Sequence, residues 1–223
     1  LNVSPSDRVQ QMALNLERWR WLPQDLGERY ILVNIPEFHL EVVAQGATVM
    51  EMPVIVGKPN SRTPLLSSTM TYLVLSPSWT VPPSIAGKEI GAKGMHKFQV
   101  LGDAGEAGDV SAALRSGQVR LRQPPGPKNP LGGVKFMFAN PFSVYLHDTS
   151  SRQLFTRSQR GLSHGCVRIG KPLDLAVYLL ADQPRWTRAA VDKAMRRTKE
   201  QYVNLKQPIG VHLAYWTAWV DAE

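Results

Sequence analysis

The chain has 223 residues, 43% of them hydrophobic and 20% charged, which is enough apolar material for a buried core and excludes general disorder. No apolar run approaches the roughly 18 residues of a membrane-spanning helix, and a single cysteine excludes an internal disulfide. The 26 Lys and Arg outnumber the 18 Asp and Glu, so the formal net charge of +8 favours an anionic partner without choosing one.

The N-terminal residues predict a helix. Between residues 7 and 19, apolar side chains recur at three- and four-residue spacing, so they share one helix face. Ser4 or Ser6 is placed to cap the start of this helix, and Gly27 follows its end. The chain begins with Leu1 and not with Met, which favours a piece of a longer protein.

Strands are predicted next, without helices between them. Short runs rich in β-branched and apolar residues are bounded by turn residues such as Gly46 and Gly57. These runs occupy residues 30–35, 38–43, 48–56 and 70–75. A meander of this kind favours a mostly antiparallel sheet over the parallel sheet of strand–helix–strand units.

The middle of the chain, from about residue 84 to residue 133, is rich in Gly and Pro and has weak periodicity. An irregular stretch of this length inside a compact domain is typical of a functional lid or an inserted lobe. Within it we expect short strands at residues 98–101 and 119–122 and a helical turn near residues 110–115.

Regular structure is predicted again after this stretch. The remaining elements are two strands, two helices and a last strand, expected at residues 134–138, 143–147, 173–180, 186–199 and 209–220. Pro172 occupies the first position of one helix, and Thr187 lies near the start of the other. The predicted fold class is therefore mainly β with flanking helices (α+β), with residues 172–223 supplying C-terminal helices and a strand.

The block Ser163-His164-Gly165-Cys166-Val167-Arg168 contains the single cysteine and carries the strongest chemical signal. A thiol is a strong nucleophile as its thiolate, which nearby His and Arg side chains favour. Gly165 permits a positive φ and a close approach of substrate, and backbone amides around Gly165 and Cys166 could bind an oxyanion. Arg168 supplies a fixed charge that can bind a carboxylate through two hydrogen bonds.

Two histidines are candidates for the base. His164 is two residues from Cys166, so in a strand the two side chains share a face. His147 ends a separate predicted strand, and a neighbouring strand could place it beside the thiol. A third group would orient the imidazole, and it can be a side chain or a backbone carbonyl.

Each of these residues also has a purely structural interpretation. A lone cysteine is often a small buried hydrophobe, a histidine can be a satisfied core residue, and Arg168 can form a surface ion pair. His147, His164 and Cys166 could also bind zinc, but the His-x-Cys spacing is unusual and no fourth ligand is evident, so we expect no metal and no cofactor. Because the basic residues form no stripe interleaved with aromatics, we expect no nucleic-acid partner.

The same block, preceded by Tyr145-Leu146-His147-Asp148-Thr149, resembles the signature of the L,D-transpeptidases with a YkuD-type catalytic domain. That signature joins an upstream histidine to a Ser/Thr-His-Gly-Cys-x-Arg block, and the intervening length fits. The resemblance runs from about residue 30 to residue 180. Three further segments are similar to the larger Gram-negative periplasmic members: Leu14-Asn15-Leu16-Glu17-Arg18-Trp19-Arg20-Trp21, Trp79-Thr80-Val81-Pro82 and Lys128-Asn129-Pro130-Leu131-Gly132.

The resemblance implies a β-sandwich-like catalytic domain over residues 27–223, preceded by an N-terminal helix and lead-in over residues 1–26. The Gly/Pro-rich stretch at about residues 84–133 is then an inserted capping lobe that covers the site.

The resemblance also implies a role for each site residue. Cys166 would attack the carbonyl of the third, diaminopimelate-type residue of a donor tetrapeptide stem, release the terminal D-alanine, and pass the acyl group to an amine of an acceptor stem. His147 would be the base or thiolate partner. The other residues would form the oxyanion hole or position substrate and loop: His164, Gly165, Ser163, Arg168 and Tyr145.

The implied partners are peptidoglycan stem peptides and, as covalent inhibitors, carbapenem β-lactams. Scaffold and wall-binding domains would lie upstream in the full-length protein, in the periplasm of a Gram-negative cell envelope. The same acyl-enzyme could instead serve hydrolysis, D-amino acid exchange or lipoprotein attachment. A catalytically silent cell-wall binding module is the alternative of a different class.

Overall fold

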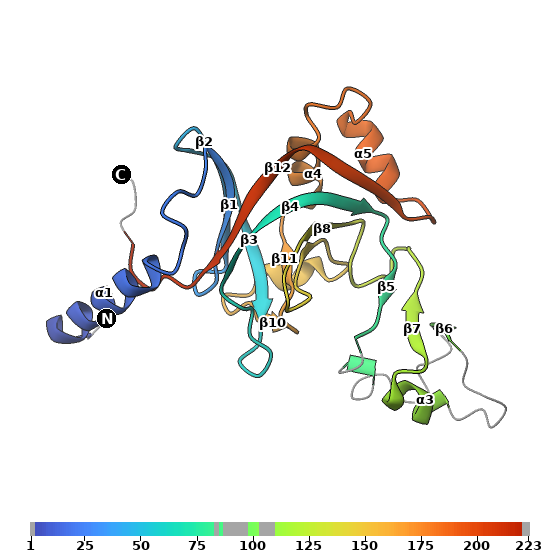
Figure 1. The fold of residues 1–223 in the computed structure, drawn as a ribbon, viewed down its shortest axis with the longest axis horizontal. Helices are drawn as coiled ribbons and strands as arrows, with labels where there is room; N and C mark the ends of the chain where they lie inside the picture. Colours follow the sequence, from blue (N-terminus) through green and yellow to red (C-terminus); the bar gives the residue numbers. More distant parts are fainter. Residues whose placement is uncertain (1–2, 83–84, 87–97, 103–109, 220–223) are drawn as a thin grey trace.

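Figure 1 shows the fold in a computed structural model, which describes residues 3–82, 85–86, 98–102 and 110–219. Parts of the predicted lobe, at residues 87–97 and 103–109, lie outside the described residues. The elements in chain order are α1 (Pro5–Trp19), β1 (Arg29–Asn34), β2 (His39–Ala44), β3 (Ala47–Gly57), β4 (Leu66–Leu75), β5 (Trp79–Thr80), β6 (Gln99–Leu101), α3 (Val110–Ser116), β7 (Arg120–Gln123), β8 (Val134–Phe138), β9 (Leu146–His147), the 3-10 helix η2 (Arg152–Thr156), β10 (Gly161–Ser163), β11 (Val167–Ile169), α4 (Pro172–Leu179), α5 (Arg188–Met195) and β12 (Gln201–Ala214).

In the described residues, one large sheet has the strand order β10-β3-β11-β9-β8-β4-β12-β1-β2, and a further pairing of β2 with β3 closes it on itself. Most neighbouring pairs are antiparallel, while β1–β12, β9–β11 and β3–β10 are parallel. The closed sheet leaves few exposed edges for pairing with another chain. The predicted fold class, mainly β with flanking helices and a sandwich-like or barrel-like sheet, is confirmed.

The core lies inside this sheet and under the C-terminal helices. Along β8, Val134, Phe136 and Phe138 are buried while the two residues between them are partly exposed, which is the alternation expected of a strand with one covered face. α4 and α5 add Leu175 and Val191 to the same core cluster. Burial of these aliphatic and aromatic side chains, at about 1.5–3 kcal/mol for each, dominates the stability of the domain.

The residues predicted to cap helix N-termini form the expected hydrogen bonds. Ser4 accepts a hydrogen bond from the backbone of Asp7 at 3.2 Å, and Thr187 accepts one from Ala190 at 3.3 Å. Pro172 is the first residue of α4, where its missing N–H leaves no hydrogen bond unmade.

The middle of the chain forms a small second sheet, β5-β7-β6, beside α3. It has its own cluster of buried residues, which includes Val81, Leu114 and Leu121. Figure 1 shows this part set apart from the large sheet, beyond the point where the chain passes from β4 to β5. A separate core is the packing expected of a lobe inserted into a larger domain.

α1 projects away from the large sheet, beside the C-terminal tail (Figure 1). The apolar face predicted for this helix is largely exposed: Val9 and Leu16 are each 66% exposed. The helix is held instead by Asn15, which donates to the Ala218 carbonyl at 2.6 Å and accepts from the Thr217 amide at 2.9 Å. The Trp19 and Trp216 rings also stack, with centroids 4.3 Å apart.

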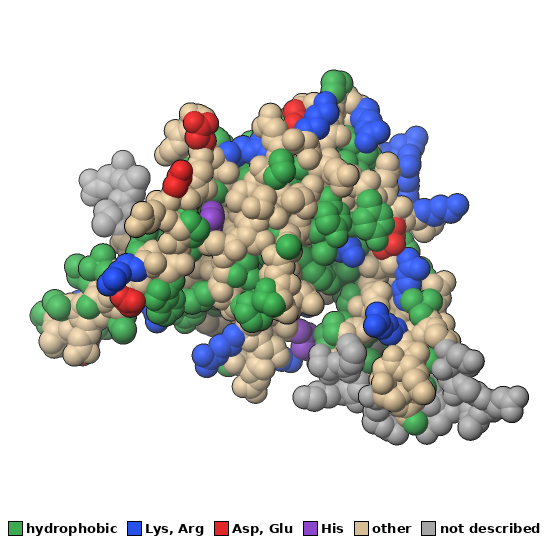
Figure 2. Space-filling model, viewed as in Figure 1, with side chains coloured by type: hydrophobic (Ala, Val, Ile, Leu, Met, Phe, Trp, Pro, Cys, Tyr) green, Lys and Arg blue, Asp and Glu red, His purple; other side chains and the backbone are tan. Residues whose placement is uncertain are grey.

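No helix in the described residues is long and apolar enough to span a bilayer. On the face in Figure 2, Lys and Arg side chains gather over α5 and the adjoining end of β12. Arg196, Arg197 and Lys199 belong to this region and line a shallow hollow there. Part of the net positive charge is therefore concentrated on one side of the molecule.

Candidate active site

The cysteine-containing block lies between β10 and β11, and it forms a tight turn, not a continuous strand. Gly165 has φ +119°, a conformation that residues with a Cβ rarely adopt. The Ser163 hydroxyl accepts a hydrogen bond from the Gly165 amide at 3.1 Å and donates one to the Cys166 carbonyl at 2.5 Å. Ser163 is buried, so it holds the turn from within.

A second hydroxyl group, from a distant part of the chain, also forms a hydrogen bond to this turn. Thr63, in the loop after β3, donates its hydroxyl proton to the Gly165 carbonyl at 2.8 Å. The same hydroxyl accepts from the Gly57 amide at 2.9 Å. The backbone on the N-terminal side of Cys166 is therefore fixed by two hydroxyl groups, Ser163 and Thr63.

Strand pairing brings the two halves of the predicted site together. β9 and β11 are parallel, with Arg168 opposite His147 and Val167 opposite Leu146. A pocket of about 220 Å³ at their ends is lined by six of the seven predicted site residues: Tyr145, His147, Ser163, His164, Cys166 and Arg168. Trp79, Pro82 and Ile85 line the same pocket from the small lobe side.

The thiol of Cys166 is protonated at rest. Burial raises its pKa above the ordinary value, and this is the largest effect. Hydrogen bonds from the backbone and the side chain of Tyr145 lower the thiol pKa in part, and so does the positive charge of Arg168. The sulfur also lies 3.9 Å from the Ser143 carbonyl, which can accept the thiol proton.

His147 is uncharged at neutral pH. It is only 4% exposed, and burial, with a smaller contribution from the Arg168 charge, lowers its pKa to about 3. Its Nδ1 lies 2.5 Å from the Asp148 carbonyl oxygen. Because a carbonyl can only accept, Nδ1 carries the proton and Nε2 keeps the lone pair that a general base requires.

The group that orients this imidazole is therefore a backbone carbonyl, the alternative that residue types alone left open. That carbonyl is itself held by the side chain of Asp148, which accepts from the amides of Gly133 at 2.8 Å and Thr149 at 2.7 Å. Arg152 donates to the same carboxylate at 2.7 Å. Asp148 thus supports His147 through three partners of its own.

Arg168 brings positive charge into the pocket without a carboxylate partner in the described residues. Its Nε is buried and has no hydrogen-bond partner there, and burial lowers the pKa of its guanidinium. An unpartnered buried N–H is costly, so such a group is expected to be satisfied by a water molecule or a ligand. His164, by contrast, is exposed, and its Nε2 lies 3.3 Å from Lys58 Nζ.

In the described part of the chain, no hydrogen bond joins the His147 ring directly to the Cys166 thiol. Tyr145 contacts both groups: its ring centroid is 5.7 Å from that of His147, and its side chain bonds to the sulfur. Catalytic hydrogen bonds are often long in unliganded sites and shorten when substrate binds. The described residues also contain no group of three or more His, Cys, Asp or Glu side chains placed to hold a metal ion.

The buried neutral imidazole makes a testable contribution to acid stability. In the unfolded chain His147 gains a proton near pH 6.5, whereas in the fold it does so only near pH 3. Its contribution is therefore complete above pH 6.5 and is lost progressively as the pH falls towards 3. Between pH 7.5 and pH 4.5 we expect the free energy of unfolding to drop by roughly 2–3 kcal/mol more in the parent chain than in His147→Gln. Urea titrations at the two pH values measure the difference, and parallel losses in both chains would contradict it.

Sequence reasoning missed three contributors to this site. Asp148 directly follows His147 in the sequence, and this position could have indicated its supporting role. Thr63 contacts Gly165 across 102 positions of sequence, and no local pattern identifies it. Trp79 was quoted only as part of a family-like segment, and it lines the pocket with Cys166.

Comparison with known proteins adds two findings. Residues 28–193 match the model of the YkuD family, the L,D-transpeptidase catalytic domain. A Haemophilus influenzae protein named "Putative L,D-transpeptidase" is 31% identical over 229 residues, which cover 97% of this chain and 46% of that protein. The chain thus spans about half the length of this curated relative.

Solved structures of L,D-transpeptidases also align with this chain, at low identity. An L,D-transpeptidase from Mycobacterium smegmatis aligns with a TM-score of 0.42 at 16% identity, covering 83% of this chain and 58% of that one. L,D-transpeptidase 3 from Mycobacterium tuberculosis, in complex with a faropenem-derived adduct, aligns with a TM-score of 0.39 at 14% identity, covering 84% and 60%.

Proposed function

Because the chain belongs to the family of YkuD-type L,D-transpeptidase catalytic domains, we propose that it is a peptidoglycan L,D-transpeptidase with Cys166 as the nucleophile. One observation supports this most directly. A pocket of about 220 Å³ holds the protonated thiol, a neutral imidazole with its Nε2 lone pair available, and a guanidinium whose buried Nε has no partner among the described residues. These are the groups that a cysteine acyl transfer on a carboxylate-bearing peptide requires.

In the first half-reaction, His147 Nε2 takes the thiol proton as the sulfur attacks the carbonyl carbon of the third residue of a donor tetrapeptide. The C–S bond forms and the carbonyl oxygen becomes an oxyanion. The oxyanion then collapses, the C–N bond breaks, and the imidazolium gives its proton to the leaving D-alanine amine. The products are a thioester on Cys166 and free D-alanine, with His147 neutral again.

In the second half-reaction, an amine of an acceptor stem attacks the thioester carbon. His147 takes a proton from that amine, the C–S bond breaks, and the proton returns to the sulfur. One amide bond replaces another, so no oxidant, reductant or energy donor is required. The same thioester would give a tripeptide if water attacked in place of the amine.

The other residues receive supporting roles. We assign the oxyanion to the Cys166 amide, because the Gly165 amide already donates to Ser163. Arg168 would hold a stem carboxylate, and Tyr145 would stabilise the developing thiolate through its bond to the sulfur. Ser163 keeps the turn in place, and His164 stands at the exposed rim of the pocket.

The small lobe is proposed to act as the cap of this site. Its side supplies Trp79, Pro82 and Ile85 to the pocket wall, although each lies far from Cys166 in the sequence. Apolar walls exclude water, and water competes with the acceptor amine for the thioester. A cap of this kind would therefore favour transfer over hydrolysis.

The proposal extends to partners and location. Stem peptides carry carboxylates, which the basic region over α5 would attract in a salt-dependent manner. Carbapenem β-lactams would acylate Cys166, since their strained carbonyl offers the sulfur the same reaction. The enzyme would act in the periplasm of a Gram-negative envelope, within a longer protein that carries upstream scaffold or wall-binding domains.

A product assay tests the reaction. With purified tetrapeptide stems as both donor and acceptor, we expect D-alanine release together with cross-linked dimer, because the acceptor amine outcompetes water in a capped site. Chromatography with mass detection separates dimer from tripeptide. If tripeptide formed without any dimer, the reaction would be hydrolysis and not transfer. Stem binding without D-alanine release, in a chain with a titratable thiol, would favour the silent binding module.

A further inference from the structure

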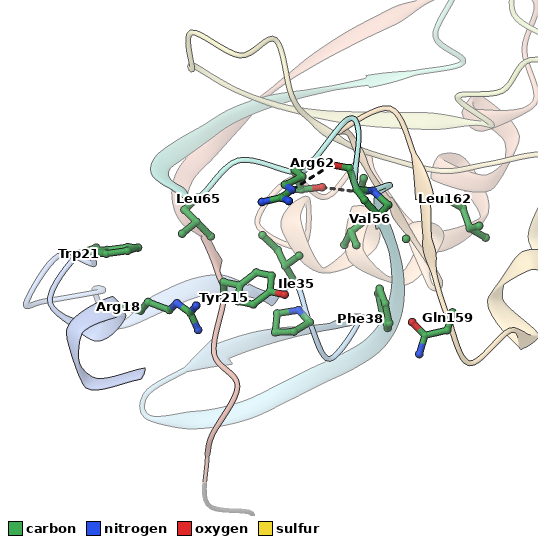
Figure 3. A pocket seen from close by; sticks show the side chains of 15 residues that line it. Arg18, Trp21, Ile35, Phe38, Val56, Arg62, Leu65, Gln159, Leu162 and Tyr215 are labelled. Atoms are coloured by element: carbon green, nitrogen blue, oxygen red, sulfur yellow. Dashed lines mark hydrogen bonds between the residues drawn. The ribbon is translucent and has the colours of Figure 1, made fainter. Parts of the chain in front are cut away.

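A cavity larger than the thiol pocket lies beside the catalytic turn. It measures about 770 Å³ and is lined by the end of α1, the β1–β2 turn, the loop after β3, β10 and the C-terminal tail. Figure 3 shows Arg18 and Trp21 on one side, Phe38 and Gln159 on the other, and Tyr215 between them. We call this space the Arg18–Arg62 cavity, after its two guanidinium groups.

The Arg18–Arg62 cavity and the thiol pocket share a wall. Gly161 and Leu162 of β10 face the large cavity, while Ser163 and His164, which follow directly, line the thiol pocket. Thr63 also lines the large cavity and donates to the Gly165 carbonyl at 2.8 Å. A ligand in the cavity would therefore lie against the loop that holds Cys166 in place.

The lining has the chemistry of a site for an anionic peptide. It contains two arginines and no Asp or Glu, and the rest of the wall is mainly aliphatic, aromatic and proline side chains. The Arg18 guanidinium lies 5.0 Å over the Tyr215 ring, and Arg62 donates through Nε to the Pro59 carbonyl at 3.2 Å. Each keeps further N–H donors, and neither forms an ion pair within the described residues. Such guanidiniums match the geometry of carboxylates and of phosphates, and peptide stems carry carboxylates.

Size separates the two spaces. Pockets that enclose a drug-sized ligand usually measure roughly 300–1,000 Å³, so the thiol pocket at about 220 Å³ is small even for one stem. Transfer needs two stems at once, and the second must bind near the thioester without displacing the first. The Arg18–Arg62 cavity is large enough for a short peptide and adjoins the loop that carries the acyl group.

The arginine side of the cavity is also pre-organised. α1 is tied to the tail by the two Asn15 hydrogen bonds and by the Trp19–Trp216 stack, which fixes the helix end that bears Arg18. Both α1 and the tail lie outside the residues that match the family model. The cavity is therefore a feature that the matched domain core does not build alone.

We propose that the Arg18–Arg62 cavity binds the acceptor stem through its carboxylates and so governs the second half-reaction. This inference rests on the proposed transpeptidase function and assigns the acceptor a site of its own. The apolar wall receives the alanine methyl groups of the stem, and Arg18 and Arg62 receive its carboxylates. Sugar binding to the exposed aromatic faces is the competing use of the same surface, and the test below distinguishes it.

The test compares Arg18→Glu with Arg20→Glu. Both change the same charge near the same helix end, but Arg20 is exposed and does not line the cavity. Acylation is followed first, as the mass gain of the intact chain with tetrapeptide donor. Transfer is then followed from the isolated thioester at increasing acceptor concentration. For Arg18→Glu we expect the acceptor concentration at half-maximal transfer to rise at least about tenfold, against less than about twofold for Arg20→Glu.

Two further measurements keep the outcomes separate. The tripeptide product is titrated into the Cys166→Ala chain with and without Arg18→Glu, and its Kd should rise by a similar factor. This readout needs no catalysis, so a parent chain that never acylates would count against the proposed function while the titration still decides the acceptor site. If Arg18→Glu lowers the melting temperature, both measurements are repeated with Arg18→Gln, which removes the positive charge without adding a negative one.

Equal transfer by Arg18→Glu and Arg20→Glu, with equal Kd for the tripeptide, would overturn the acceptor site. A stem whose carboxylates are amidated should bind the parent as weakly as it binds Arg18→Glu. If the amidated stem or a peptide-free disaccharide bound as tightly as the acidic stem, the cavity would be a sugar site and the proposal would fail.

Discussion

A chain carrying Cys166→Ala is expected to form no covalent adduct with a tetrapeptide stem, while the parent chain gains the mass of the acyl group. The reason is that the sulfur supplies the bond to the acyl carbon, and neither an alanine methyl nor water in its place can store that intermediate. Removing a nucleophile of this kind lowers the rate by about a thousandfold or more. Intact-mass spectrometry of both chains after incubation with the stem measures the difference.

The single cysteine makes the control direct, because any thiol signal from the chain comes from Cys166. The substitution removes only one partly buried sulfur, so the melting temperature should change little. A stem adduct on a folded Cys166→Ala chain would remove Cys166 from the nucleophile role. The same pair of chains tests carbapenem acylation, with the same expectation.

His147→Gln is expected to slow acylation by about 100- to 10,000-fold, the range that a positioned general base contributes. The glutamine amide can still donate to the Asp148 carbonyl, but it has no basic nitrogen to take the thiol proton. The residual rate should rise with pH, because only thiol already ionised in solution can then react, and burial raises the pKa of that thiol. Stopped acylation time courses from pH 6 to pH 10 provide both the rates and the slope.

His39→Gln is the matched control, since His39 lies on β2 and does not line the thiol pocket. It should acylate like the parent across the pH range. Parent-like rates in His147→Gln would assign the base to another group, with His164 next in line because it lines the same pocket.

Much of the architecture follows from short-range signals. The strand predicted at residues 134–138 coincides with β8, because its alternation of buried and partly exposed positions is complete within five residues. Ser4, Pro172 and Thr187 marked helix starts, since capping depends on atoms within a few residues of each other. The cysteine block and His147 were assigned to one site through their resemblance to a family signature, and the pairing of β9 with β11 brings them to one pocket.

Where the prediction was wrong, a distant or irregular contact decided the structure. The strand expected at residues 143–147 begins only at Leu146, because the Asn140 side chain accepts the Phe142 and Val144 amides and Ser143 has φ +55°. The last strand starts at Gln201, well before the predicted residue 209. Pro208, which cannot donate to a strand ladder, lies where the pairing with β4 shifts register. That strand also ends at Ala214 and not at residue 220.

Some details of the site could not be predicted from the sequence, because they also depend on distant contacts. The hydroxyl of Thr63 meets Gly165 only because the loop after β3 passes under the turn. The choice of the Asp148 carbonyl to orient His147 depends on where that carbonyl points, which residue types do not specify. The helix at the N-terminus was predicted, but its apolar stripe is exposed and a buried asparagine anchors it instead.

The protonated resting state of Cys166 has a consequence for damage by oxidants. Peroxide and related oxidants attack thiolates, and the sulfinic and sulfonic acids that follow are not readily reversed. A thiol whose pKa is raised by burial spends the interval between turnovers in the form that these reagents attack slowly. In the proposed reaction, the thiolate forms only when a base and an acyl carbon are both within reach. The single cysteine of this chain is therefore expected to be oxidised slowly while no substrate is bound.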